Sequence, residues 1–105
     1  MPISARAYEG LRAAVVYNPQ KAREFLDIMR TFPFMVKRKS EDAYGPLILL
    51  LKTQPGRPLV WSPPDALTER QWAACRVFGD EWLRGGVTKR ALADAIEAIL
   101  EQVGT

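Results

Sequence analysis

The chain has 105 residues, of which 48% are hydrophobic and 26% are charged, and its net charge at neutral pH is +3. This length predicts a single globular domain over residues 1–105, with a core that needs neither disulfide nor metal. The sequence contains no histidine and one cysteine. These counts exclude a histidine-based catalytic triad, an internal disulfide and a cysteine–histidine zinc site.

The location of the protein is predicted from its apolar segments. The longest unbroken apolar run covers residues 47–51, which is far too short to cross a membrane. The first ten residues, MPISARAYEG, lack the basic and apolar segments of a secretion signal. We therefore expect a cytoplasmic protein with no membrane partner.

Two helices are predicted at the N-terminal end, over residues 4–17 and from 19 to about 30. Asn18 and Pro19 separate them, because asparagine favours the N-cap and proline the first helical position. Phe32-Pro33 should end the second helix. The predicted buried faces are Ala7, Tyr8, Leu11, Ala14 and Val15 in the first helix, and Ala22, Phe25, Leu26 and Met29 in the second.

The middle of the chain favours a small antiparallel sheet of two or three strands. The segments FMVKRK (34–39), LILLLKT (47–53) and PLVW (58–61) have the composition of short strands. Between the last two, Pro55-Gly56 is typical of a type II turn. The alternative for residues 46–53 is a short buried helix that begins at Pro46.

Two further helices are predicted at the C-terminal end. Thr68 and Gln71 have the spacing of a capping box, and Gly85-Gly86 should end that helix near residue 84. Thr88 begins the last helix. The apolar faces contain Trp72, Cys75, Val77, Phe78, Trp82 and Leu83 in the first of these helices and Leu92, Ile96, Ile99, Leu100 and Val103 in the second. The predicted fold is therefore α+β, with this last pair forming an αα-hairpin.

The segment GGVTKRALADAIEAIL (85–100) is similar to the second half of a DNA-binding helix-turn-helix, because Lys89 and Arg90 occupy the first turn after a glycine turn. Three acidic residues, Asp94, Glu97 and Glu101, follow on the predicted outer face and would repel phosphates. Arg90 is instead expected to pair with Asp94. We interpret this helix as a packing element of the hairpin.

Catalysis and cofactor binding have no sequence support. Cys75 lies within an apolar helix face, whereas a reactive thiol needs an electropositive, partly exposed setting. The neighbouring carboxylates Asp80 and Glu81 do not face each other on a helix. Gly85-Gly86 lacks both the preceding strand and the following lysine of a phosphate loop. We therefore predict a protein that is not an enzyme and has no cofactor.

Two binding functions remain. The first is a small interaction module, adaptor-like or inhibitor-like, that docks onto a larger protein. Tyrosine, tryptophan and arginine commonly anchor such interfaces, and the candidate anchors are Tyr8, Tyr17, Tyr44, Arg57 and Trp61. The alternative is DNA or RNA binding by the basic N-terminal half, where ten basic and five acidic residues precede position 58. Its candidate residues are Arg30, Lys37, Arg38, Lys39 and Lys52.

Overall fold

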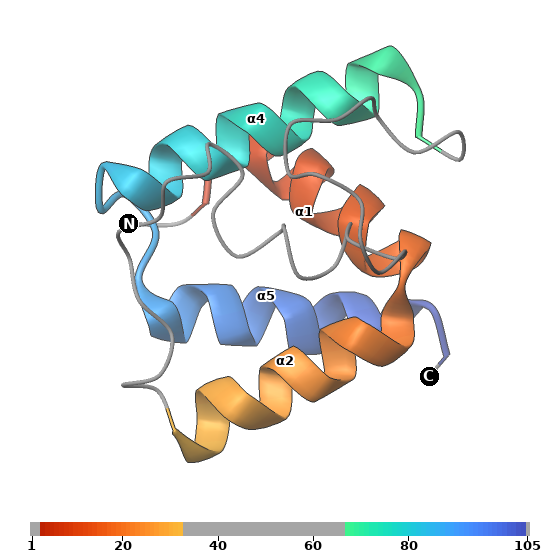
Figure 1. Cartoon of the computed structure of the whole chain (residues 1–105), viewed down its shortest axis with the longest axis vertical. Coiled ribbons are helices and arrows are strands. Elements are labelled where there is room, and N and C mark those ends of the chain that lie inside the picture. Colours follow the sequence, from red (N-terminus) through yellow and green to blue (C-terminus); the bar gives the residue numbers. More distant parts are fainter. Residues whose placement is uncertain (1–2, 33–66, 105) are drawn as a thin grey trace, which may run out of the picture.

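The computed structural model describes residues 3–32 and 67–104, and these residues form four helices (Figure 1). The helices are α1 (Ala5–Tyr17), α2 (Pro19–Thr31), α4 (Glu69–Leu83) and α5 (Lys89–Gln102). All four helices were predicted and each begins within two residues of the expected position; the ends of α1, α2 and α4 lie equally close to theirs.

The predicted α+β fold class is wrong, because the described part of the chain is helical throughout and contains no strand. The α+β class depended entirely on three predicted strands between residues 34 and 61, which lie outside the described residues. A short apolar run suits a buried helix as well as a buried strand, so hydrophobic content alone gave no basis for choosing the strand there.

Asn18 forms the junction between the first two helices, as the sequence indicates. Its backbone N–H donates to the Ala14 carbonyl at 3.1 Å and closes the last turn of α1. Its side-chain Oδ1 accepts from the Lys21 N–H at 3.2 Å and caps α2, with Pro19 at the first position. One residue therefore satisfies groups at two helix ends and fixes the corner between them.

The predicted capping box of α4 is also confirmed. The Thr68 hydroxyl accepts from the Gln71 N–H at 3.1 Å, and the Gln71 Oε1 accepts from the Thr68 N–H at 2.9 Å. Gly85 has a φ of 80° after α4, a left-handed conformation that glycine adopts without steric cost. Thr88 then caps α5 by accepting from the Ala91 N–H at 3.0 Å.

The core forms around α1, which packs along α4 and also contacts α5 and α2, while α2 lies on α5 (Figure 1). The start of α1 is tied to the end of α4, because the Ser4 hydroxyl and N–H both donate to the Glu81 carboxylate. The largest fully buried side chains are Trp82, Phe78, Leu11, Leu92, Ile96, Ile99, Val15, Val87 and Cys75.

The prediction that α4 and α5 pack against each other as an αα-hairpin is wrong. These helices follow one another in the chain but make few direct contacts, since α4 packs on α1 and α5 on α2 and α1. The linker between them carries Val87 fully into the core. Helical periodicity identifies a buried face but not the helix that covers it, so the sequence left this pairing undetermined.

The backbones of α1 and α4 approach each other closely at Gly10, where the two helices cross. A Cβ atom added at Gly10 would lie 2.3 Å from the Ala74 carbonyl oxygen and 2.5 Å from the Cys75 nitrogen. Both are backbone atoms, which cannot move aside as a flexible side chain would. The Cys75 Sγ also donates to the Gly10 carbonyl, at 3.4 Å. Only glycine fits at this position without displacing one helix from the other.

We predict that Gly10→Ala destabilises the chain by about 1–3 kcal/mol, because the added methyl group forces the two helices apart. Alanine otherwise favours a helix over glycine by about 1 kcal/mol. Urea unfolding followed by circular dichroism measures the change. Ala98→Gly, at an exposed position of α5, calibrates the propensity difference in this chain. A Gly10→Ala variant more stable than the parent would contradict the close crossing.

Candidate functional site

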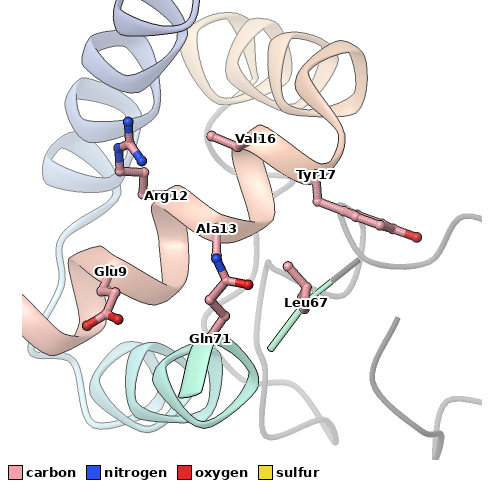
Figure 2. A pocket seen from close by; sticks show the side chains of 7 residues that line it. All are labelled: Glu9, Arg12, Ala13, Val16, Tyr17, Leu67 and Gln71. Carbon is pink, nitrogen blue, oxygen red and sulfur yellow. The ribbon is translucent and has the colours of Figure 1, made fainter. Parts of the chain in front are cut away.

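A surface pocket of about 590 Å³ lies between the outer side of α1 and the beginning of α4 (Figure 2). We call it the α1–α4 groove. Its lining residues come from three elements: α1, the residue just before the Thr68 cap, and the first turn of α4. They are Glu9, Arg12, Ala13, Val16, Tyr17, Leu67 and Gln71.

The floor of the groove includes the apolar side chains of a second stripe on α1, beside the stripe that faces the core. Positions 9, 12, 13, 16 and 17 follow the i, i+3, i+4, i+7, i+8 spacing of one side of a helix, with Ala13 and Val16 on the floor and the charged Glu9 and Arg12 at the rim. Val16 is 45% exposed within this stripe. Leu67 is half-buried against the core from the other side. The groove therefore lies between two packed helices and has apolar side chains on its floor.

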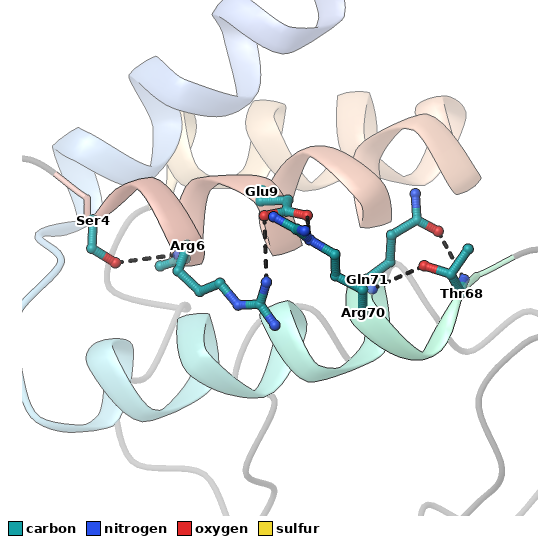
Figure 3. Close-up of polar contacts among 7 residues, drawn as sticks. Ser4, Arg6, Glu9, Thr68, Arg70 and Gln71 are labelled. Carbon is teal, nitrogen blue, oxygen red and sulfur yellow. Dashed lines mark hydrogen bonds and ion pairs between the residues drawn. The ribbon is translucent and has the colours of Figure 1, made fainter.

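The rim of the groove is polar, and its carboxylate is already paired (Figure 3). The Glu9 carboxylate lies 3.0 Å from Nε of Arg70 and 3.7 Å from a guanidinium nitrogen of Arg6. Arg12 is exposed and has no ion pair with any residue that the structure describes. The balance of charge at the rim is therefore positive.

Of the five candidate protein-binding anchors, the structure places one, Tyr17, in the groove (Figure 2). Tyr8 is half-buried against the core. The two lie nine residues apart on one helix, which puts them on roughly opposite sides, so α1 does not bring them together. The other three anchors lie outside the described residues: Tyr44, Arg57 and Trp61.

Arg30, a candidate nucleic-acid contact, joins α2 to α5. Its Nη2 lies 2.9 Å from a Glu97 carboxylate oxygen and 3.1 Å from an Asp94 oxygen. These hydrogen bonds, chiefly the one to Glu97, raise the pKa of the Arg30 guanidinium. The sequence had paired Asp94 with Arg90, but the structure pairs it with Arg30. The other candidates for this function lie outside the described residues: Lys37, Arg38, Lys39 and Lys52.

Cys75 is a core residue, as predicted. Its side chain is fully buried where α4 crosses α1, and this burial raises the pKa of the thiol to about 12. The protonated thiol is consequently the stable form at neutral pH. Trp82 is likewise fully buried, whereas Trp72 is half-buried against the core.

Two features are absent from residues 3–32 and 67–104. No helix there is both long and apolar enough to span a membrane. No group of three histidine, cysteine, aspartate or glutamate side chains is placed to hold a metal ion.

At the start of α5, Arg90 is exposed and Lys89 is half-buried.

The sequence did not single out six of the residues that line the groove as site residues: Glu9, Arg12, Ala13, Val16, Leu67 and Gln71. The available signal was that Val16 and Tyr17 are large apolar residues outside the core stripe of the first helix. Such residues are common on protein surfaces, so the signal is weak by itself. The groove appears only when the first turn of α4 lies beside this stripe.

Comparisons of the chain with models of protein families, with curated proteins and with solved structures return no match. The groove and its surroundings therefore carry the information on function that this chain offers.

Replacing Arg30 with glutamine should lower the free energy of unfolding slightly, because it removes two ion pairs between α2 and α5 while keeping a polar side chain and part of the aliphatic stem. The pairs are partly exposed, so the loss should shrink as salt is added. Arg23→Gln, an exposed residue of the same helix, is the matched control. Urea unfolding at low and high salt measures both variants. Equal losses from the two changes would contradict a specific role for Arg30.

Because burial raises the pKa of the Cys75 thiol, we predict that the folded chain loses stability at alkaline pH. An unfolded thiol titrates near ~8.5, whereas the folded thiol keeps its proton until about pH 12. The part of the free energy of unfolding that depends on this thiol is therefore fully present below a pH of ~8.5. Between that pH and about 12 it falls as the pH rises, by at most ~1.4 kcal/mol per pH unit. Denaturant unfolding from pH 7 to 11 should show a shallower decline for Cys75→Ala than for the parent. Parallel curves would contradict the raised pKa.

Proposed function

We propose that the chain is a small non-enzymatic interaction module that docks onto a larger protein, as an adaptor or inhibitor does, in the cytoplasm. The observation that carries this proposal is the α1–α4 groove. It combines an apolar floor, including the 45%-exposed Val16, with a polar rim and the candidate anchor Tyr17. Protein interfaces have this arrangement, with apolar or aromatic contacts at the centre and polar groups around them.

The packing beneath the groove supports a binding role. Ala13 and Val16 flank Ala14 and Val15 along α1, and the latter two are fully buried in the core. The opposite wall begins at the capping box of α4. A partner would therefore meet a surface whose backbone is already ordered, which lowers the entropic cost of association.

The polar groups of the groove favour binding over catalysis. General acid–base chemistry requires a group that can exchange a proton with the substrate. The Glu9 carboxylate is instead held by two guanidinium groups, from Arg6 and Arg70. The thiol of Cys75 is buried where α1 and α4 cross and does not line the groove.

Photo-crosslinking tests the proposal. Benzoylphenylalanine placed at position 16 should form an adduct with a specific protein when the full chain is irradiated in an extract of its source cell. The control is the same residue at position 101, which is exposed on α5 and outside the groove. Absence of a specific adduct at position 16, or an identical adduct from position 101, would contradict docking through the groove.

A further inference from the structure

We propose that the α1–α4 groove receives an acidic amphipathic helix of the partner protein. An apolar side chain of that helix would contact the floor at Val16 and Leu67, and a carboxylate would pair with Arg12. This inference rests on the proposed function and adds the chemistry of the partner segment.

The floor of the groove requires an apolar contact. Ala13, Val16 and Leu67 offer methyl groups and no hydrogen-bonding side chains (Figure 2). Transferring this surface from water to an apolar partner is favourable in proportion to the area covered. A volume of about 590 Å³ accommodates a few apolar side chains. The partner segment therefore needs at least one large apolar residue.

Gln71 and Arg12 add hydrogen-bond donors to the rim that are not used within the described residues. The Gln71 Oε1 is used by the Thr68 N–H, which leaves the Nε2 hydrogens free of partners within the described residues. In Figure 2 the Gln71 side chain points from α4 toward α1. The Arg12 guanidinium adds further donors and a positive charge, while the Glu9 carboxylate is paired. Donors with a net positive charge are complementary to a carboxylate.

The backbone of the groove favours a helical partner over an extended one. Both walls are helices, whose backbone hydrogen bonds are made internally, so they offer no strand edge to an incoming chain. A segment buried here must satisfy its own backbone N–H and C=O groups. A helix does so and presents its side chains at the three- and four-residue spacing that the α1 stripe itself has.

The chemistry of the groove fits an acidic peptide better than a nucleic acid. Its floor is mainly aliphatic, with Tyr17 as the one aromatic residue among those lining it. Binding of nucleic acid depends on neutralising several phosphates with cationic side chains. Among the described residues that line the groove, Arg12 is the one cation without an ion pair, and the charge of neighbouring Glu9 is balanced by Arg6 and Arg70.

A displayed library of amphipathic 16-residue helices tests this chemistry without knowledge of the natural partner. The apolar face is varied among leucine, isoleucine, valine and phenylalanine, and each charged position encodes glutamate or lysine at random. Selection on the full chain should enrich glutamate over lysine by about threefold at positions near the apolar face, the scale of one exposed ion pair. Equal frequencies, enrichment of lysine, or no selected binder would overturn the proposal.

Two variants locate the effect. Arg12→Glu should reverse the preference toward lysine, whereas Arg76→Glu makes the same change in net charge on an exposed residue of α4 outside the groove and should keep it. Val16→Gln retains helix propensity and adds no charge, and it should lower the affinity of selected peptides several-fold. Reversal by both glutamate variants, or unchanged affinity in Val16→Gln, would place the contact elsewhere and overturn the proposal.

Other occupants give distinct results. A single-stranded oligonucleotide that competes with the selected peptides and is weakened by Arg12→Glu would indicate a nucleic-acid groove. A dimer in light scattering that dissociates in Val16→Gln would indicate a second copy of the chain. Either result overturns the acidic helix. If the position-16 adduct forms but selection shows no glutamate preference, the docking function stands and this inference alone fails.

Discussion

The contact between the backbones of α1 and α4 at Gly10 is the constraint on which the remaining structure depends. With Ala74 directly against Gly10, the two helices lie closer than any larger residue permits. The pairs Ser4–Glu81 and Glu9–Arg70 join the same two helices on either side of this crossing. Because α1 is fixed in this way, its inner stripe completes the core with α2 and α5, and its outer stripe is held beside the start of α4.

The groove thus depends on the same helix that organises the core. Val15 and Val16 are adjacent, yet one is fully buried and the other is 45% exposed. The capping box of α4 has a comparable double role, since the bond that satisfies the Thr68 N–H also orients Gln71 toward the groove. A binding surface built from capped, packed helices needs little reorganisation when a partner arrives.

The sequence predicted the helices well because their ends are local chemistry. At each helix start, a capping side chain accepts a hydrogen bond from a backbone N–H three residues further along the chain. The caps are Asn18, Thr68 and Thr88. Contacts between helices were harder to predict, because they involve residues that are distant in the chain. Three examples are the close approach of Gly10 to Ala74, the ion pairs of Arg30 with Glu97 and Asp94, and the lack of packing between α4 and α5. Only Tyr17 of the groove was anticipated, because an outer stripe becomes a site only beside a second helix.

We propose that a partner covers the outer stripe of α1. Isotope-edited nuclear Overhauser spectroscopy of the chain bound to that partner tests this contact most directly. Ile28 on α2, which is 41% exposed and lies outside the groove, provides the comparison within the same molecule. We predict Overhauser contacts from partner protons to the methyl groups of Ala13 and Val16 and none to Ile28. Contacts to Ile28 without contacts to Ala13 or Val16 would contradict it.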